Sequence, residues 1–461
     1  MVMKDNQMTP LESRATWGLG TVFSLRMLGM FMVLPVLTTY GMALSGASEA
    51  LIGLAIGIYG LAQAVFQIPF GLLSDRIGRK PLIVFGLAIF AFGSAIAALT
   101  DSIWGVILGR ALQGSGAIAA AVMALLSDLT REQNRTKAMA FIGISFGITF
   151  AIAMVLGPII THALGLHALF WMIALLALCG IAITVAVVPN ASSHVLNRES
   201  SMVKGSFSKV LGNPKLLKLN FGIMCLHILL MSSFVVLPRV MEQAGFPASD
   251  HWKVYLVTML TSFVAVIPFI IYAEKKRRMK QVFMSCVAVL LLAELVLWSA
   301  GGQRLWVIIA GIQLFFLAFN LMEAILPSLV SKESPAGYKG TAMGVYSTSQ
   351  FIGVAIGGSL GGWIFGVAGA GAVFIACAAI AVVWFAVSAT MQEPPYVSSL
   401  RLTLSERAVN HPALASRLKA QPGVADVVVV PAERSAYIKI DSKVTSRQAL
   451  EQFLGDLGTG A

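Results

Sequence analysis

Long apolar stretches separated by short polar loops fill most of the chain. A transmembrane helix needs about 20 mostly apolar residues, and the sequence before residue 390 contains roughly twelve windows of that kind. The first window follows Lys4 and Arg14 and has no small-residue cleavage site behind it, so we predict a retained helix rather than a signal peptide. The pattern predicts an all-α membrane protein with twelve transmembrane helices. The predicted spans are 16–40, 50–73, 81–99, 103–126, 138–161, 167–188, 216–238, 253–273, 281–300, 305–327, 341–366 and 370–389.

A polar segment divides these helices into two sets of six. Residues 191–215 are rich in Asn, Ser and charged side chains, whereas regions 1–190 and 216–392 hold the apolar stretches. The two regions share a trace of internal repetition, because ALLSDLTRE at 124–132 and AILPSLVSKE at 324–333 follow the fourth helix of each set. Parallel repeats are a known plan of membrane transporters. We therefore predict two six-helix halves joined by a cytoplasmic linker.

The composition changes again in the tail, 396–461, which no longer reads as membrane-spanning. Its pattern predicts the order β-α-β-β-α, which fits a small ferredoxin-like α+β domain without its final strand. Its basic and acidic side chains nearly cancel, so nucleic-acid binding is not expected, and its residue types do not favour a metal site. The predicted elements are strand 396–404, helix 406–420, strands 424–430 and 436–441, and helix 447–457.

The composition supports a membrane protein with a fixed orientation. Hydrophobic residues make up 57% of the 461 residues and charged residues only 12%, against about 25% charged in soluble proteins. The net charge of +12 lies in alternate loops: one set holds 18 Lys and Arg, whereas the opposite set holds three, Arg239, Lys253 and Arg304. Because positive loops stay in the cytoplasm, we predict a multi-pass inner-membrane protein with both termini cytoplasmic.

The loop between the second and third helices carries a dense motif. A glycine at position 71 allows two helices to approach closely, Asp75 can pair with an arginine or a helix N-terminus, and Gly78 permits a tight turn. The basic residues that follow hold the loop at the inner membrane face. The stretch reads Gly71-Leu72-Leu73-Ser74-Asp75-Arg76-Ile77-Gly78-Arg79-Lys80.

This loop resembles the signature G-x-x-x-D-R-x-G-R-[KR] of the major facilitator superfamily. Two further motifs extend the resemblance to its drug:proton antiporter group. Arg110 and Gln113 are similar to the R-x-x-Q-G-x-G-x-A motif of proton-coupled members, and Gly157-Pro158 is similar to the antiporter motif G-x-x-x-G-P-x-x-G-G. Ala153 replaces the first glycine of that last motif, and Thr161-His162 replace its final glycine pair. The resemblance implies two six-helix halves around a central cavity, alternating access and a helix-packing role for Ala153, Gly157 and Pro158.

Five ionisable side chains fall inside predicted spans, where each costs roughly 2.5–3.5 kcal/mol on insertion scales and marks a functional candidate. They are Arg26, Arg110, His227, Glu294 and Glu323. All but Glu294 fall on helices that line the cavity in the resembled family. We predict that Glu323 carries the proton, with a solvated position near the cytoplasmic end as the alternative. Arg110, with Gln113 in the same motif, is expected to tune a neighbouring carboxyl, and Glu294 to pack or snorkel outside the cavity. For Arg26 a cavity role and a structural bond to backbone carbonyls stay open, as do titration and neutral hydrogen bonding for His227.

A second group gathers at the cytoplasmic membrane face. Asp128 ends the fourth predicted helix on the side of the signature loop. We predict that Asp75, Arg79 and Asp128 form an ion network that latches the two halves in an outward-open state. Protonation of either aspartate would weaken the network, because an arginine would lose its counter-charge.

Together these features predict a secondary transporter that exports a small organic or drug-like solute in exchange for protons. A Walker A motif and a nucleophile–base constellation are not found, so we predict neither an enzyme nor a bound cofactor. The expected partners are the lipid bilayer, protons and an unidentified solute. Two alternatives stay open: a proton symporter or facilitated carrier of a metabolite, and a membrane sensor with the tail as its output. The tail could also bind a regulatory ligand or self-associate.

Overall fold

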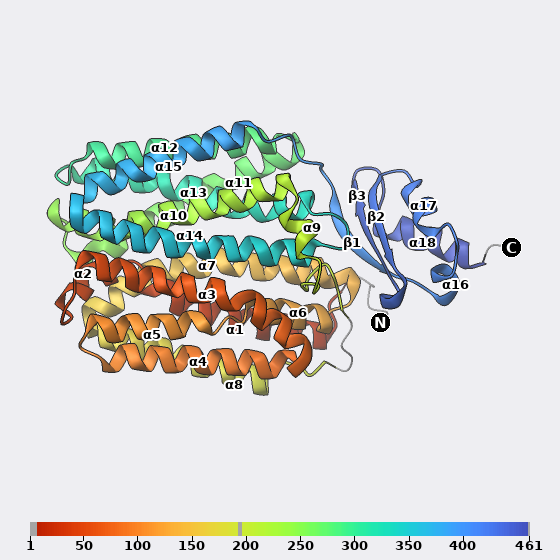
Figure 1. Cartoon of the computed structure of the whole chain (residues 1–461), viewed down its shortest axis with the longest axis horizontal. Coiled ribbons are helices and arrows are strands. Elements are labelled where there is room, and N and C mark those ends of the chain that lie inside the picture. The colour runs from red at the N-terminus through yellow and green to blue at the C-terminus, as the bar shows by residue number, and fades with distance from the viewer. Residues whose placement is uncertain (1–6, 192–195, 460–461) are drawn as a thin grey trace.

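The computed structural model describes residues 7–191 and 196–459 and shows a long helical bundle with a small mixed domain at one end (Figure 1). Within these residues, 11 helices are long and apolar enough to cross a membrane, or 12 if the bent pair at the N-terminus counts as one span. The prediction of a twelve-span all-α membrane protein is confirmed on that count. We call the end that carries the mixed domain the domain end and the other the far end.

The first half ends at Ala186 and contains two interrupted spans. The predicted helix 16–40 is wrong as one continuous helix, because the chain bends by 42° before Leu37, next to Pro35. The predicted helix 103–126 breaks at Gly116, which lies so close to another helix that an added Cβ would be 2.2 Å from the Gly86 carbonyl oxygen. The helices are α1 (Pro10–Met32), α2 (Leu37–Tyr40), η1 (Gly41–Ala43), α3 (Glu49–Ile77), α4 (Arg79–Leu99), α5 (Ile103–Ser115), α6 (Ala119–Leu129), α7 (Glu132–Leu164) and α8 (Leu166–Ala186).

The second half begins at Pro214, where Asn213 caps the first helix by accepting hydrogen bonds from the backbone of Lys215 and Leu216. Part of the predicted linker 191–215 forms a short helix, and residues 192–195 of it lie outside the described residues. The elements are α9 (Phe207–Leu211), α10 (Pro214–Gln243), η2 (Ala248–Asp250), α11 (His251–Lys275), α12 (Met279–Ser299), α13 (Leu305–Glu333), α14 (Lys339–Ala368) and α15 (Ala370–Ala389).

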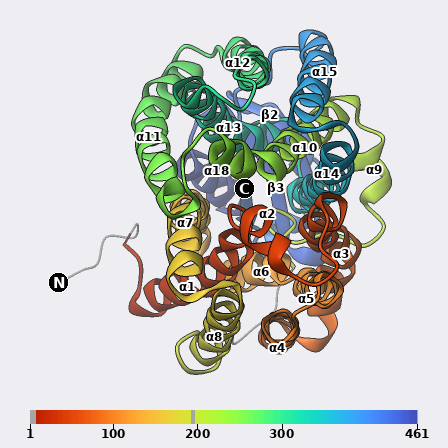
Figure 2. The same cartoon turned by 90° about the vertical axis from the view of Figure 1, so that its left-hand side faces the viewer.

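The two halves are in closest contact toward the far end. Figure 2, viewed from that end, shows α14 beside α3 and α7 beside α11. A Cβ added at Gly53 would lie 2.4 Å from the Gly358 carbonyl oxygen and 2.6 Å from the Gly362 Cα, so the backbones of α3 and α14 touch. Arg239 on α10 also lies 3.8 Å from Glu49 on α3. The structure is therefore closed between the halves at the far end.

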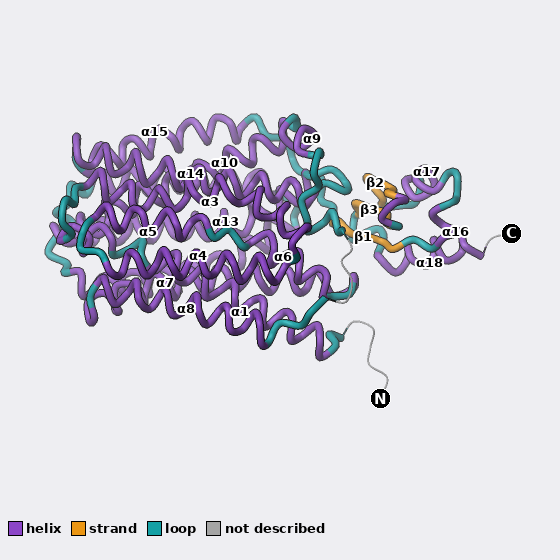
Figure 3. The backbone as a smooth tube through the Cα atoms, turned by 60° about the horizontal axis from the view of Figure 1, so that its bottom comes forward, coloured by secondary structure: helices purple, strands orange, loops and turns teal. Residues whose placement is uncertain are grey.

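The tail forms a three-stranded antiparallel sheet with the order β1-β3-β2 and its own apolar core (Figure 3). This is the order of a ferredoxin-like sheet without its last strand, as predicted for the described part of the tail. The predicted helix 406–420 is wrong as one helix, because His411-Pro412 interrupts it. The elements are β1 (Ser398–Thr403), α16 (Glu406–Val409), α17 (Leu414–Lys419), β2 (Val424–Val430), η3 (Pro431–Glu433), β3 (Ser435–Ile440) and α18 (Arg447–Thr459).

Candidate functional site

A cavity of about 670 Å³ lies between the two halves at the domain end. Helices α3, α6 and α7 line it from the first half and α13 and α14 from the second, and the linker and the tail domain close part of its mouth. Four methionines contribute to the wall. Gln67 lines the cavity from the first half, and Ala324 lines it from the second half. The methionines are Met123, Met139, Met202 and Met343.

A chain of hydrogen bonds leads inward from this cavity through the first half. Gln67 lines the cavity, and its Oε1 accepts a hydrogen bond from Gln63 Nε2 at 3.2 Å. Gln63 Oε1 in turn accepts from Arg26 Nη2 at 2.9 Å. Residues four apart share one face of a helix, so α3 presents these amides and Tyr59 as one polar stripe in an otherwise apolar span.

Arg26 lies at the centre of this network and is 1% exposed. Its guanidinium donates to the Tyr59 hydroxyl at 2.8 Å and to the Gly116 carbonyl oxygen at 3.0 Å. The Gly116 carbonyl is accessible because the helix breaks there between α5 and α6. Arg26 thus bonds to backbone carbonyls and also to side chains that lead to the cavity, and its cavity role stays a prediction.

Arg110 and Gln113 lie next to this network on α5, and both are buried. Arg110 donates to the Ala55 carbonyl oxygen at 3.2 Å and to Gln113 Oε1 at 3.0 Å, and its guanidinium lies 4.7 Å from the centre of the Tyr59 ring. Among the described residues, neither Arg26 nor Arg110 has a carboxylate within 4.0 Å. Two buried positive charges thus face the middle of the bundle without a direct counter-ion.

The second half contributes the predicted proton carrier, Glu323, together with His227. Glu323 Oε1 on α13 lies 3.3 Å from His227 Nε2 on α10. Gln350 on α14 places its Nε2 3.1 Å from the same ring nitrogen. Pro327 on α13 and Ser347 on α14 line the cavity one turn nearer its mouth, so the three polar side chains lie directly behind its inner wall.

The surroundings of His227 define how many protons the pair can hold. His227 Nδ1 lies 3.2 Å from the Ile223 carbonyl oxygen, so this nitrogen carries a hydrogen. In the neutral ring Nε2 is then an acceptor, and a charged Glu323 carboxylate facing it would be repelled. One further proton, on the carboxyl or on Nε2, turns that contact into a hydrogen bond, and the Gln350 amide, 3.1 Å from the same nitrogen, then has to share or give up its own hydrogen bond there. The geometry therefore suits a pair that takes up and releases a single proton.

The two polar groups meet at a small second cavity of about 20 Å³, close to the room that one water needs. Tyr59 and Arg110 line it from the first half, and His227 and Gln350 line it from the second. The structure thus brings Arg26, Arg110 and Gln113 into one hydrogen-bonded group and His227 and Glu323 into another, and Arg110 and His227 line the same small cavity.

Glu294 lies apart from these groups, in the packing between α12 and α10. It is 0% exposed and accepts a hydrogen bond from Ser233 Oγ at 2.7 Å. It lines neither of the two cavities described above.

The sequence did not single out four further polar residues of these groups, Tyr59, Gln63, Gln67 and Gln350. The spacing of four between Tyr59, Gln63 and Gln67 on an apolar helix was a usable signal.

The signature loop gathers its charged residues within the first half. Arg79 pairs with Asp75, and its Nε lies 3.6 Å from Asp128 Oδ2. Gly78 has a φ of 98°, which permits the turn between α3 and α4. The predicted triad is assembled, and these ion pairs join α3, α4 and α6. Of the remaining residues, Gly71 packs against Met202 of the linker, Lys80 donates to the Val188 carbonyl oxygen, and Arg76 is exposed.

The motif on α7 lies where α1 ends. A Cβ added at Gly157 would lie 2.3 Å from the Met32 carbonyl oxygen, so this glycine permits close contact between the two backbones. Ala153, one turn away, is fully buried, and Pro158 lies within the helix. The geometry is compatible with the packing role that the resemblance implies.

Comparison with known proteins identifies the class. Residues 19–358 match the model of the Major Facilitator Superfamily, and residues 400–456 match the YajR YAM domain. The chain therefore belongs to the major facilitator superfamily, and by family and fold it is a membrane transporter.

Relatives and solved structures agree with this assignment. The chain is 74% identical over 452 residues to the inner membrane transport protein YajR of Escherichia coli K12, covering 98% of this chain and 99% of that protein. It is 25% identical over 342 residues to the multidrug resistance protein MdtH of Yersinia enterocolitica, covering 73% and 83%. The nucleoside transporter NupG and the human organic anion transporter MFSD10 share the fold, with TM-scores of 0.63 and 0.58 at 14% and 20% identity. Each covers 82% of this chain and 100% of its own.

Proposed function

We propose that this protein is a proton-driven antiporter of the inner membrane that exports a small organic solute. The observation that carries the proposal is the Glu323–His227 pair, 3.3 Å apart behind the inner wall of the cavity and beside the small cavity that both halves share. A group that exchanges one proton at the point where the halves meet can couple proton movement to their rearrangement.

The orientation follows from the basic loops. Loops rich in Lys and Arg lie at the domain end, which on the positive-inside rule is the cytoplasmic side. Both termini and the tail domain are then cytoplasmic, and the cavity of about 670 Å³ faces the cytoplasm. The structure would represent an inward-open state in which a cytoplasmic solute can enter.

The proton couples to this state through the second half. With one proton, the Glu323–His227 contact is a hydrogen bond that holds α10 against α13. Loss of that proton leaves a carboxylate facing the lone pair of Nε2, which loosens the contact and favours the outward-open state. Arg110, which lines the same small cavity as His227, disfavours a second positive charge there. Each cycle would therefore move one proton inward as the solute moves outward.

The cavity suits an organic solute. Its volume lies within the range of about 300–1,000 Å³ typical of small-molecule sites. The four wall methionines have flexible, polarizable side chains that adapt to different shapes, while Gln67 and the arginines behind it supply polar contacts. A multidrug resistance protein among the relatives fits this class of cargo.

The Asp75–Arg79–Asp128 group would act as the conformational switch at the cytoplasmic face. In the inward-open state its ion pairs hold α3, α4 and α6 together, and we propose that the assembled surface latches the halves when the cavity closes. The test is Asp75→Asn: an unchanged balance of conformations would contradict the latch.

Transport in reconstituted vesicles tests the function. A thermal-shift screen of purified protein first identifies a binding solute, and that solute is then followed in proteoliposomes after a pH jump. Antiport predicts movement of the solute against the proton flow, whereas a symporter moves both together and a facilitated carrier ignores the jump. Deletion of residues 396–461 separates the sensor alternative, because a transporter keeps much of its flux without the tail.

A further inference from the structure

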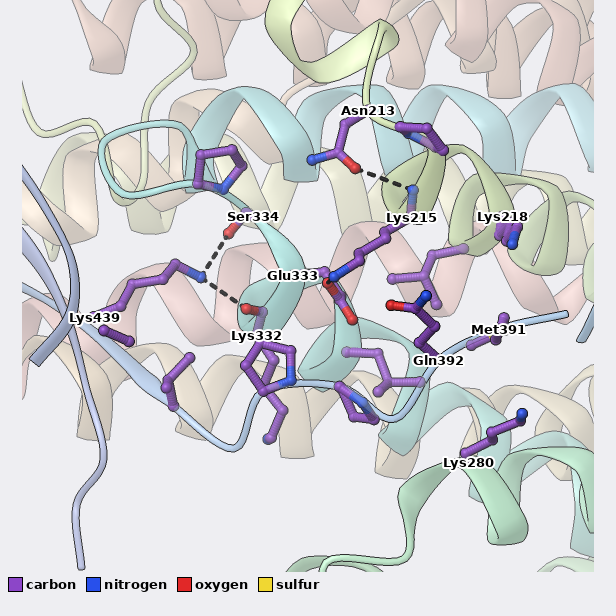
Figure 4. A pocket seen from close by; sticks show the side chains of 18 of the residues that line it. Asn213, Lys215, Lys218, Lys280, Lys332, Glu333, Ser334, Met391, Gln392 and Lys439 are labelled. Carbon is purple, nitrogen blue, oxygen red and sulfur yellow. Dashed lines mark hydrogen bonds and ion pairs between the residues drawn. The ribbon is translucent and has the colours of Figure 1, made fainter. Parts of the chain in front are cut away.

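A second large cavity, of about 710 Å³, lies outside the transport pathway at the domain end of the second half (Figure 4). Its walls are the first turn of α10, the end of α13, the segment that follows α15, and the edge of the tail domain at Asp426 and Lys439. The docked tail domain therefore completes one wall of the pocket.

The charge of this pocket is strongly positive. Five lysines line it, against two carboxylates, Glu333 and Asp426, which leaves three positive charges in excess. The carboxylates are already engaged: Asp426 accepts hydrogen bonds from the backbone of Ala336 and Val427, and Glu333 lies 3.9 Å from one lysine. The lysines are Lys215, Lys218, Lys280, Lys332 and Lys439.

Two of these lysines have partners within the protein that take up most of their hydrogen-bond donors. Lys439 is 4% exposed and donates to the carbonyl oxygens of Ser331 and Lys332 at the end of α13. Lys332 pairs with Glu274 at 3.0 Å. Lys439 therefore helps to dock the tail domain, whereas Lys332 joins α13 to α11, and neither needs a ligand.

The other three lysines keep unused donors. An ammonium group has three N–H donors, and Lys218 and Lys280 each give one, to the carbonyl oxygens of Thr390 at 3.1 Å and Ala389 at 3.4 Å. Lys215 is 3.9 Å from Glu333, beyond hydrogen-bond distance. Figure 4 shows Lys215 and Gln392 extending into the same space from opposite walls. At least two donors on each lysine remain for a ligand.

The position of the pocket adds a second constraint. It lies at the ends of membrane-spanning helices, the level at which lipid headgroups meet the protein, and Leu219 and Leu329 give it an apolar wall. Basic pockets between helix ends on the cytoplasmic side suit phosphate headgroups of anionic lipids. An occupant there needs negative charge for the lysines and some apolar surface for the leucines.

We propose that this pocket binds a phosphate ester, either the headgroup of an anionic phospholipid or a soluble phosphate ester, between the helix ends and the tail domain. Its phosphate oxygens would accept the free N–H donors of Lys215, Lys218 and Lys280. Because Lys439 of the tail domain belongs to the same wall, its positive charge lets the bound group also stabilise the docked tail domain. The inference does not depend on proton coupling or on the transported solute.

Thermal melting of the full-length protein in detergent tests the proposal. One arm titrates phosphatidylglycerol, with phosphatidylcholine as the neutral lipid, and another titrates glycerol 3-phosphate. The pocket variant is Lys215→Gln/Lys218→Gln/Lys280→Gln, and the matched control is Lys137→Gln/Lys275→Gln/Lys276→Gln, which removes the same charge from exposed sites outside the pocket. Lys215→Arg/Lys218→Arg/Lys280→Arg keeps the charge.

We expect one phosphate probe to raise the melting temperature of the wild type, the control and the arginine variant. In the pocket variant its apparent affinity should fall by at least about tenfold, about 1.4 kcal/mol, because the charge-assisted hydrogen bonds of three lysines are lost. An effect of phosphatidylglycerol alone identifies a lipid, and an effect of glycerol 3-phosphate identifies a soluble ligand. The single variant Lys215→Gln, at an exposed side chain, repeats the test if the triple variant does not fold. Equal losses in the pocket and control variants, or no stabilisation of the wild type by either probe, would overturn the proposal.

Discussion

His227 Nε2 lies 3.3 Å from Glu323 Oε1, which joins α10 to α13 behind the inner wall of the cavity. The hydrogen on His227 Nδ1 is committed to the Ile223 carbonyl oxygen, 3.2 Å away. This arrangement makes the protonation of Glu323 a condition for a favourable contact. The proposed coupling therefore depends on one carboxyl group, and a second buried carboxyl in the same half provides its control.

Glu323→Gln should abolish proton-driven transport while the protein still folds. Glutamine offers an amide N–H to His227 permanently, so the pair behaves as if it were always protonated. We expect solute accumulation driven by a pH gradient to fall by on the order of a hundredfold, the range that general acid–base groups contribute. Glu294→Gln is the matched control, since Glu294 accepts from Ser233 and a glutamine oxygen can do the same. Equal flux in the two variants would contradict the role of Glu323.

Arg26→Lys should destabilise the protein although the charge is kept. The guanidinium bonds to Tyr59, Gln63 and the Gly116 carbonyl oxygen in one plane, and a lysine cannot reach all three. Unsatisfied buried groups cost about 1–3 kcal/mol each, so we expect a loss of a few kcal/mol in the free energy of unfolding. Thermal melting in detergent measures it, with the exposed Arg304→Lys as the control.

Gly53→Ala should shift the protein away from the inward-open state. The new Cβ would lie 2.4 Å from the Gly358 carbonyl oxygen, so α3 and α14 must separate at the far end. Overpacking of this kind costs about 1–3 kcal/mol. Gly366→Ala is the control, since its Cβ would make only ordinary contacts, with Glu49 Cβ at 3.6 Å and the Ala50 backbone nitrogen at 3.9 Å. Chemical labelling of a cysteine introduced at the far end should increase in Gly53→Ala only. A similar increase in Gly366→Ala would contradict the account of this contact.

Docking of the tail domain should become stronger as pH rises from about 8 toward 10.5. Burial is the main cause that lowers the pKa of Lys439 from 10.5 to about 8; Lys339 acts in the same direction, while Glu199, Asp426 and Glu333 act in the opposite direction. Lys439 thus binds its proton less tightly in the docked domain than in the released domain. Below pH 8 the lysine is charged in both states, and burying that charge weakens docking in full. Between pH 8 and 10.5 the docked lysine loses its proton, and this unfavourable contribution to docking disappears.

Spin labels at Lys275→Cys and Val444→Cys, both exposed positions, report docking by their distance. Lys439→Met should remove the pH dependence between 8 and 10.5. Burial raises the pKa of Glu199, so that group favours docking at acid pH and loses this contribution as pH rises through its folded pKa. The measurement is therefore repeated with Glu199→Gln. A distance distribution that does not change with pH, in the labelled protein with Glu199 and in the one with Glu199→Gln, would contradict the role of Lys439.

The sequence predicted the parts of this fold that depend on residue type and order. Apolar windows revealed the spans, since a helix in hydrocarbon needs that length, and the alternation in the tail revealed its strands. The break at Gly116 was missed because it lies inside an apolar window whose hydropathy does not change there, whereas the bend after Met32 had a local signal in Pro35. The interruption at His411-Pro412 had a local signal in its proline.

The candidate site was predictable as a set of residues but not as a network. Charge in an apolar window singled out Arg26, Arg110, His227 and Glu323, since each is costly there. Their pairing could not be predicted, because His227 and Glu323 lie 96 positions apart and meet only through the packing of α10 on α13. The tail-domain pocket was also hidden, since its lysines come from four separate segments.

The proposed coupling requires that the proton on Glu323 sets the balance between inward-open and outward-open states. The most direct measurement is the distance between paired spin labels as a function of pH, at Leu164 and Gln303 for the far end and at Gln133 and Lys275 for the domain end. All four positions are exposed, and exposed Cys179 is first replaced by serine.

In the wild type, raising the pH should widen the far end and narrow the domain end, whereas Glu323→Gln should keep the inward-open distances at every pH. A pH-dependent shift of the same size in Glu323→Gln would contradict the central claim.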